Sequence, residues 1–515
     1  MVLEGALAAW SAAVGHEHVD ATPAVLDAAS RATYATRARP SAVVRPGTVA
    51  EVQACVRVAA GSGVPLWPLS TGKNWGYGSR VPGADGAVIL DLSRLHRIVQ
   101  YDPEMGFVTV EPGVTQAQLH AFLADQGGTH WLDATGSTPD ASLIGNIMER
   151  GFGVTPYGDH VGRATGYEVV LADGILVHTG FGAWPGARTA ALDRWGPGPS
   201  LEGLFSQTGL GVVTKLSVAL MPKPEGANSG FLDIHGEETL AGAIDAMRRL
   251  QLEGTVRSAP WFGNVYRLLG VVMRFPWSTT APPLRPEQAH ALGRQAGIPP
   301  WTGTFAIYGT DRQLAAARDR VRDVLGSVGV QPAFVDTEAL QSAPPTGRRS
   351  VEHAMHRGYT GGLINAVRRA YWRKRTAPGT DADLDADSVG FIFVNASVPF
   401  RGADVVEAAR IAEEVVIDAG FEPSLSCHSI RERALVMLMT VSYDRDVPGE
   451  DERAQATHDA LAERWMSRGW YAFRLGLHSM PLFERAEPSD RRAVEAITHA
   501  LDPAGVLSSG RYRAP

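Results

Sequence analysis

The sequence predicts an α+β fold divided into two domains of unequal size. A chain of 515 residues is too long for one ordinary hydrophobic core. Up to residue 225, short strands and helices are separated by long glycine-rich loops, whereas residues 230–450 alternate long helices with strands. The second pattern favours a sheet that carries helices on one face.

The first helix is expected over residues 46–62, where Thr48 forms a capped start and apolar residues follow at helical spacing. A hairpin is expected further along, because two short apolar runs flank an Ala-Asp-Gly turn. The remaining predicted elements of this half are short. They are strands at 65–69, 87–92 and 106–110, a helix at 115–125, and the hairpin strands at 167–171 and 175–178.

In the second half, helices are expected over 240–252, 312–329 and 402–420, and strands over 390–394 and 434–441. Residues 279–286 are rich in proline and residues 376–387 are acidic with few apolar side chains, so we expect both to be mobile. The tail from residue 455 has a helical pattern and ends in a polar segment that contains glycine.

Composition excludes several classes of protein. A net charge of −7 offers no basic stripe for a nucleic acid. The two cysteines, Cys55 and Cys427, are too few for a disulfide framework or a cysteine metal site. The N-terminus does not read as a signal peptide, and no apolar run approaches the ~18 residues of a membrane span. We therefore expect a cytoplasmic protein without a membrane partner, and the Ala, Gly, Arg and Pro content is typical of a GC-rich bacterial genome.

Two other kinds of site are not supported by the residues. The run 16–18 (HEH) and the pair His353 and His356 each lack a third ligand in register, so we expect surface histidines and no metal. The chain contains no Gly-x-Ser-x-Gly elbow of a hydrolase. The tryptophans at 261, 277 and 301 are expected either to line a cleft or to belong to the core.

The strongest local feature is the glycine-rich run at residues 70–78 (STGKNWGYG), directly after a predicted strand. Its spacing fits neither a Walker A loop nor a Rossmann fingerprint. Successive backbone N–H groups in such a turn form an anion nest, and glycines let a pyrophosphate approach the main chain. A tight surface turn is the alternative interpretation of this segment.

A second run, at residues 135–146 (TGSTPDASLIGN), adds small hydroxyl side chains and glycines, and residues 149–160 (ERGFGVTPYGDH) follow it closely. One such loop is weak evidence for a ligand. Two loops separated by a strand and a helix indicate a long ligand that lies across several loops.

These segments resemble the vanillyl-alcohol oxidase / p-cresol methylhydroxylase family of flavoproteins. The resemblance is strongest at 149–160 and also covers residues 68–78, 136–146, 204–214, 390–405 and 502–511 in the expected order. It implies a discontinuous FAD-binding domain of the PCMH type, formed by residues 1–225 and 455–515. This domain encloses a cap domain, residues 226–454, built on an antiparallel sheet flanked by helices.

The resemblance also implies which residues hold FAD, with the flavin at the domain interface, where a substrate pocket is expected. The residues so assigned are Ser70, Thr71, Gly72, Lys73, Asn74, Gly76, Gly136, Ser137, Ser142, Gly145, Asn146, Glu149, Gly151, Gly153, Tyr157, Gly158, Gly211, Val212, Val213 and Arg511.

The sequence departs from the family where many relatives attach FAD covalently. Those relatives use a histidine or tyrosine near the position of Arg431 and Glu432, but residues 434–437 are ALVM here. Lys73 stands where broader relatives place a linking histidine. We therefore expect noncovalent FAD. His428 and Cys427 are the nearby residues that could form a covalent link instead.

The phenol-binding set of the family is incomplete in this chain. Tyr77 and Arg474 match two of its members, whereas Val154 and Phe473 replace two tyrosines. Arg474 can stabilise developing negative charge, and Tyr77 can hydrogen-bond the substrate. Asp140 resembles the acidic residue beside the flavin that takes a proton or balances charge; an Asx turn after Pro139 is its alternative role.

We thus expect an FAD-dependent oxidase or dehydrogenase that moves a hydride from an aromatic or secondary-metabolite-like alcohol, amine or activated C–H group to the flavin. We expect O₂ to reoxidise it. The alternatives are a dehydrogenase with a cytochrome acceptor, a redox-neutral isomerase or cyclase that requires flavin, and a noncatalytic flavin-binding protein. The partner is a small-molecule substrate, and a homodimer is compatible with these features.

Overall fold

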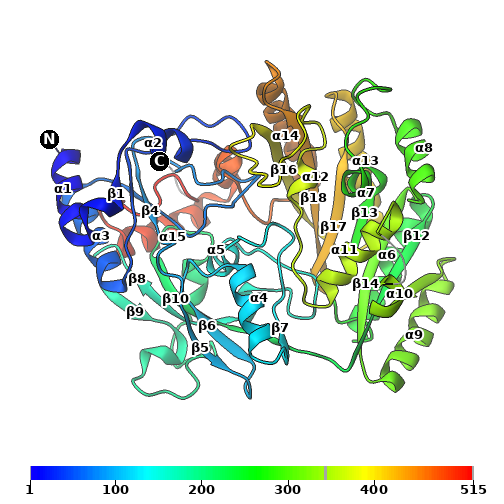
Figure 1. The fold of residues 1–515 in the computed structure, drawn as a ribbon, viewed down its shortest axis with the longest axis horizontal. Coiled ribbons are helices and arrows are strands. Elements are labelled where there is room, and N and C mark those ends of the chain that lie inside the picture. Colours follow the sequence, from blue (N-terminus) through cyan, green and yellow to red (C-terminus); the bar gives the residue numbers. More distant parts are fainter. Residues whose placement is uncertain (1, 342–344, 513–515) are drawn as a thin grey trace.

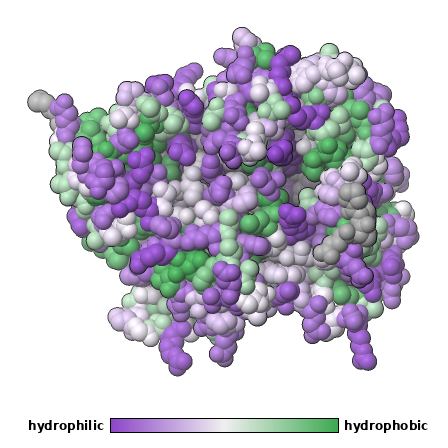
Figure 2. All heavy atoms as spheres, in the orientation of Figure 1, coloured by the Kyte–Doolittle hydropathy of each residue, from purple (hydrophilic) through white to green (hydrophobic). Residues whose placement is uncertain are grey.

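A computed structural model describes residues 2–341 and 345–512 of the chain. Figure 1 shows two parts side by side, with the N-terminal segments and the C-terminal tail together on the left and a large sheet with its helices on the right. On the face in Figure 2, hydrophilic side chains separate several apolar areas. Among the described helices, none has the length and apolar character needed to cross a membrane.

The N-terminal part begins with a four-stranded sheet in the order β1-β2-β4-β3, whose last two pairings are parallel. The predicted helix over 46–62 is α3 (Val49–Ser62), and Thr48 caps it by accepting a hydrogen bond from the Glu51 amide at 3.2 Å. Helix α1 (Val2–Val14) contacts α3. The strands are β1 (Val19–Asp20), β2 (Ala42–Val44), β3 (Leu66–Leu69) and β4 (Val88–Asp91).

The C-terminal tail completes this sheet. The Leu66 amide donates to the Val506 carbonyl at 2.7 Å, and the Ser508 amide donates to the Leu66 carbonyl at 2.8 Å. Val506 and Leu507 are buried in the same core as α3. The first and last segments of the chain therefore pack together as one structural unit.

A second, antiparallel sheet in the order β5-β6-β10-β8-β9 carries the next part of this unit. Apolar side chains of α4 (Gln116–Asp125) and α5 (Leu143–Met148) are buried in one core with its strands. The expected hairpin is formed by β8 and β9. The strands are β5 (Ile98–Asp102), β6 (Phe107–Val110), β8 (Ala164–Val170), β9 (Leu176–His178) and β10 (Val212–Ala219).

The cap is built on a seven-stranded sheet in the order β15-β12-β14-β13-β17-β18-β16, and all six pairings are antiparallel. This arrangement confirms the predicted antiparallel cap sheet. Its strands are β12 (Gly226–Ile234), β13 (Trp261–Asn264), β14 (Trp301–Gly309), β15 (Pro332–Val335), β16 (Val389–Pro399), β17 (Ser424–Arg431) and β18 (Ala434–Asp444).

Helices flank this sheet, as Figure 1 shows for its right-hand part. Those that share the largest apolar core with the sheet are α6 (Glu237–Leu252), α9 (Asp311–Gly326), α13 (Gly402–Asp418) and α14 (Glu450–Met466). A smaller group of helices packs together on the sheet: α7 (Val265–Val272), α11 (Arg348–Tyr359) and α12 (Val367–Ala370). The remaining helices are α2 (Pro23–Ala29), α8 (Pro286–Ala296), α10 (Thr337–Gln341) and α15 (Pro488–Leu501).

Helix α14 belongs to the cap by its packing. Ala454, Leu461 and Trp465 are buried in the core of the cap sheet, and the Trp465 indole donates to the Ala408 carbonyl of α13 at 3.1 Å. The expected domain boundary between residues 454 and 455 lies inside this helix. The packing does not separate the two parts at this point, because the apolar face of α14 on both sides of this boundary is buried in the cap core.

Candidate active site

A cavity of about 570 Å³ lies where the two parts of the molecule meet. Its size is within the usual range for ligand sites. One side is formed by residues 67–75 and 77–79, by residues between 134 and 154, and by the tail near residue 511. The other side comes from strands and helices of the cap. A long ligand can therefore contact both parts at once.

The first glycine-rich loop follows β3 and contributes a continuous stretch, residues 70–75, to the lining. Gly76 does not line the cavity. Its φ is +77°, and a side chain there would come within 2.5 Å of the Phe393 ring on β16. Gly76 thus lets this loop lie close against the cap. Lys73 adds an ion pair with Asp383 of the cap at 3.2 Å.

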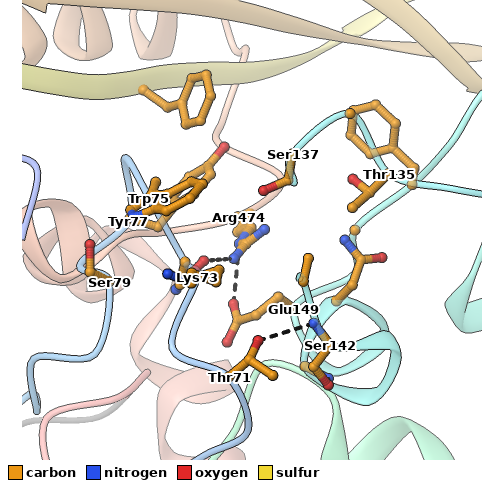
Figure 3. Close-up of a pocket in the computed structure, with 18 of the residues that line it drawn as sticks. Thr71, Lys73, Trp75, Tyr77, Ser79, Thr135, Ser137, Ser142, Glu149 and Arg474 are labelled. Atoms are coloured by element: carbon orange, nitrogen blue, oxygen red, sulfur yellow. Dashed lines mark hydrogen bonds and ion pairs between the residues drawn. The ribbon is translucent and has the colours of Figure 1, made fainter. Parts of the chain in front are cut away.

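The second glycine-rich loop is tied directly to the first. The Ser142 amide donates to the Thr71 hydroxyl at 3.1 Å, a bond drawn in Figure 3. A side chain at Gly145 would come within 2.6 Å of the Ser70 hydroxyl, so only glycine allows this approach. The Ser142 hydroxyl also accepts from the Gly145 amide at 3.0 Å and caps α5. The two loops form one cradle of small side chains and backbone.

Residues 154–160 support this cradle through hydrogen bonds to Asn146 and Asp133. His160 lies between the Asn146 side-chain oxygen at 2.6 Å and the Asp133 carboxylate at 2.7 Å. The same Asp133 carboxylate accepts from the Thr155 amide at 2.7 Å. Asp133 lies so close to Gly153 that no side chain fits there. The most family-specific motif of the sequence is thus a buried polar network that fixes the loop.

Arg474 occupies the centre of the site, where Figure 3 shows it between the first loop and Glu149. Its Nε lies 3.1 Å from a Glu149 carboxylate oxygen, its Nη2 donates to Asn74, and its guanidinium lies 4.1 Å from the Tyr77 ring centroid. Glu149 also pairs with Arg511. Burial lowers the pKa of Arg474, and it raises the pKa of Tyr77 to about 12 despite the opposing effect of Arg474.

An aromatic wall leads from Arg474 into the cap. The rings of Phe473 and Phe152 lie 5.9 Å apart, those of Phe152 and His428 5.0 Å, and those of His428 and Trp261 6.0 Å between centroids. Val154 lies beside this wall and is buried. Trp261 therefore lines the cleft, which was one of its two expected roles. The wall suits a flat or apolar substrate body.

The structure brings most of the predicted site residues to this cavity. Asp140 is an exception, because its side chain is exposed and does not line the cavity. Tyr157 and Gly158 also lie outside the lining and support the string at 154–160. Those that do line it are Ser70, Thr71, Gly72, Lys73, Asn74, Tyr77, Gly136, Ser137, Ser142, Gly145, Asn146, Glu149, Gly151, Gly153, Val154, Gly211, Val212, Val213, Phe473, Arg474 and Arg511.

Three arginines of the cap also line the cavity and were not identified from the sequence: Arg267, Arg368 and Arg369. Arg267 lies in α7, whose sequence VYRLLGVV is otherwise apolar. Arg369 lies in the short helix α12. A charged residue inside an apolar helix was the one signal that could have drawn attention to this end of the cavity.

The residues near the expected covalent attachment point face two ways. Neighbouring side chains of a strand point to opposite faces, so His428 and Leu438 line the cavity while Cys427 is fully buried in the cap core. Burial raises the pKa of the Cys427 thiol well above its usual range. Burial and the nearby Arg267 and Arg369 lower the pKa of His428, so its imidazole is neutral.

These features fit a long dinucleotide such as FAD. The two loops present backbone and small side chains along one side of the cavity, and glycines at 72, 136 and 145 leave room for a ligand at the main chain. The cavity continues past Arg474 into the cap, which leaves space for a substrate beyond the cofactor. Among the described residues, no group of three His, Cys, Asp or Glu side chains is placed to hold a metal.

Comparison with known proteins agrees with this site. The family profile "FAD binding domain" matches residues 40–180. The chain is 39% identical to 1'-carboxy-chondrochloren decarboxylase of Chondromyces crocatus, over 99% of this chain and 97% of that protein. It is 30% identical to the flavoprotein subunit of 4-cresol dehydrogenase (hydroxylating) of Pseudomonas putida, over 92% and 87%. The solved structure of p-cresol methylhydroxylase with substrate bound superposes with a TM-score of 0.91 at 28% identity and covers 100% of this chain and 97% of that one.

Proposed function

The chain belongs to the PCMH-type family of FAD-dependent oxidoreductases, and from this premise we propose that it oxidises an aromatic or secondary-metabolite-like small molecule. The observation that carries the proposal is the position of Arg474, between the cofactor cradle and the aromatic wall. FAD, when bound, accepts a hydride from an alcohol, amine or activated C–H carbon, and O₂ then takes the electrons as hydrogen peroxide.

Two side chains act on the reacting groups in this proposal. The Arg474 guanidinium offsets negative charge that develops during the oxidation, and burial strengthens this effect. Tyr77, with a pKa of about 12, keeps its proton at neutral pH and donates a hydrogen bond to the substrate. Phe473 and Val154 line the cavity without the hydroxyl groups of the tyrosines that they replace, so we propose a substrate other than a simple phenol. The exposed position of Asp140 gives no support for a role in proton transfer.

A specific similarity favours a second candidate reaction, an oxidation coupled to loss of carbon dioxide. The relative that is 39% identical over nearly the whole chain is called a decarboxylase of a carboxylated compound. In this reaction the carboxylate is carried by the carbon adjacent to the one that loses the hydride, and it leaves as CO₂. The electron pair of the broken bond then forms a double bond to the carbon that loses the hydride. The products identify this reaction by one CO₂ for each substrate oxidised.

The test is anaerobic mixing of the purified protein with candidate substrates, followed through the visible absorbance of the flavin. Bleaching by a substrate supports the oxidation, and oxygen admitted afterwards separates an oxidase, which recovers quickly and forms peroxide, from a dehydrogenase that needs a cytochrome-type acceptor. Product formed without bleaching, peroxide or acceptor would instead support a redox-neutral isomerase or cyclase. A protein without flavin absorbance contradicts the proposal.

We further propose that FAD is held noncovalently. The support is local: Leu438 cannot form a link, Cys427 lies in the cap core, and Lys73 is engaged with Asp383. Acid precipitation of wild type and the His428→Ala variant tests this. We expect the yellow colour in the supernatant for both proteins. A yellow wild-type pellet contradicts the proposal, and its loss in H428A would assign the link to His428.

A further inference from the structure

The cap end of the cavity contains a cationic pair that has no internal counter-charge. Arg267 is 4% exposed, and its Nη1 donates to the Thr440 hydroxyl at 2.8 Å while its Nε has no hydrogen-bond partner. The Nε of Arg369 also lacks a partner. Within residues 2–341 and 345–512, neither guanidinium forms an ion pair with an acidic side chain.

Local contacts position the chain at both arginines. The Arg267 amide donates to the Asn264 side chain at 3.1 Å, which caps α7, and the Asn264 side-chain amide donates to the Pro423 carbonyl at 2.7 Å. Arg369 packs along Gly270 of α7, where an added side chain would come within 2.9 Å of the Arg369 Cγ. The positions of the two arginines are therefore set by these contacts within the fold and not by ion pairs.

The carboxylate in an adjoining cavity does not neutralise them. Glu422 shares a small adjoining cavity with Arg369. However, both of its oxygens are occupied by Arg373, at 2.7 and 2.9 Å, with further hydrogen bonds from the Trp372 indole and the Leu284 amide. Burial, and to a smaller extent repulsion from Arg369, lowers the pKa of Arg267.

Arg267 is buried and Arg369 is partly buried. Cations in such positions are costly without an anion, because each gives up hydration without gaining a partner. Both line the substrate cavity, at the end of the aromatic wall that starts at Phe473. We infer that Arg267 and Arg369 bind the carboxylate of a substrate whose apolar or aromatic body lies along this wall. The guanidinium fork suits a carboxylate, and the apolar surroundings suit an amphipathic acid. The inference rests on the proposed function, since it assigns a substrate class to the same site.

The test is calorimetric titration of the oxidised, FAD-loaded protein with phenylbutyrate and its uncharged amide, phenylbutyramide. We expect the wild type to bind the acid about tenfold to hundredfold more tightly than the amide, as expected for charge-assisted hydrogen bonds. Arg369→Gln and Arg267→Gln are each expected to reduce this ratio to about threefold or less. A shift of the visible flavin spectrum on binding gives an independent readout.

Arg294→Gln is the matched control, because Arg294 is an exposed arginine on the neighbouring helix α8 and does not line the cavity. We expect it to keep the wild-type ratio. Arg368→Gln changes an exposed arginine that also lines the cavity and should keep most of the preference. Flavin content and Tm confirm that each variant is folded, and R369Q, at a partly exposed position, carries the test if R267Q does not fold.

Three outcomes would overturn the inference. They are equal binding of acid and amide by the wild type, a preference that survives in both R267Q and R369Q, and tighter binding of phenylpropyl phosphate than of the acid. Loss of the preference in R368Q alone would likewise move the anion site away from the pair. Because the titration needs no turnover, failure of flavin reduction contradicts the proposed function without affecting this result, and the reverse also holds.

Discussion

The two sides of the cavity are built in different ways. On the cofactor side, charges and hydrogen-bond donors are paired within the chain: Glu149 lies between Arg474 and Arg511, and His160 lies between Asn146 and Asp133. On the cap side, the lining is mostly apolar and aromatic. Of its three arginines Arg368 is exposed, and Arg267 and Arg369 form no ion pair with an acidic side chain in the described chain.

This difference separates a preformed cradle from a selective surface. Charges that are already paired within the chain need little further compensation when the ligand arrives, so this side can hold the same cofactor in every turnover. Polar groups left without partners gain them only from the correct ligand, and a ligand that lacks the matching group is rejected. We therefore expect changes on the cofactor side to affect rate and stability, and changes on the cap side to affect substrate binding.

The largest expected effect comes from Arg474→Ala. Removing the guanidinium should slow flavin reduction at saturating substrate by about 10²–10³-fold, the usual loss for a buried group that stabilises developing charge. Anaerobic stopped-flow measurement of the limiting rate checks this, with flavin content as a control for cofactor binding. Arg369→Gln is the paired variant on the cap side and should weaken substrate binding while leaving the limiting rate within about threefold. Equal effects of both variants on the rate would contradict the division.

The second prediction concerns the stability of the cradle. Asp133→Asn removes a buried carboxylate that meets both His160 and the Thr155 amide, and we expect it to lower the free energy of unfolding by about 2–3 kcal/mol. Chemical denaturation with and without added FAD measures the change. Asp125→Asn, at an exposed position, is the control and should shift stability by less than about 0.5 kcal/mol. A similarly small effect of D133N would mean that the network does not support the loop.

The same contrast explains what the sequence could predict. The cofactor loops are continuous stretches that act through backbone and small side chains, so their chemistry is visible in residues 70–78 and 135–160. The cap lining is assembled from separate strands and helices. Whether His428 or Cys427 faces the cavity depends on the strand register, in which Trp261 pairs with His428, and one residue of shift would exchange them. Composition alone does not define that register.

Three further differences have similar causes. Asp140 was expected beside the flavin by its position in the motif, but the chain at 138–141 turns outward and exposes it. The domain boundary at 454 was expected from the family resemblance, whereas the packing of α14 is decided by its apolar face against the cap core. Likewise, residues 376–387 were expected to be mobile, yet Asp383 and Asp385 bind the first glycine-rich loop.

A smaller effect is expected at this junction between the two sides. Asp385 accepts from the Ser79 hydroxyl at 2.6 Å and from the Trp75 indole at 3.1 Å, and burial raises its pKa to about 6 from 3.8. A raised carboxyl pKa means that the ionised form is disfavoured in the folded protein. Its cost is fully present above about pH 6 and disappears as the pH falls below the unfolded value.

The wild type should therefore gain roughly 1 kcal/mol relative to Asp385→Asn as the pH falls from about 7 to about 4, after allowance for solvent screening. Denaturation curves of both proteins across this range measure the difference. Subtracting the two curves removes the contribution of all other titrating groups. A flat difference would show that Asp385 titrates at its ordinary pKa.

The smallest effect is expected at the exposed contact between the two sides. Arg431 of the cap lies 2.8 Å from Asp159, with side chains 68% and 27% exposed, so water and salt screen the pair. A double-mutant cycle with Arg431→Gln and Asp159→Asn should give a coupling below about 1 kcal/mol that declines further at high salt. A coupling above about 2 kcal/mol that persists in salt would instead make this contact a lock between the cradle and the cap. The separation of rate and stability from substrate binding would then fail, because a change on either side would be transmitted through this pair to the other.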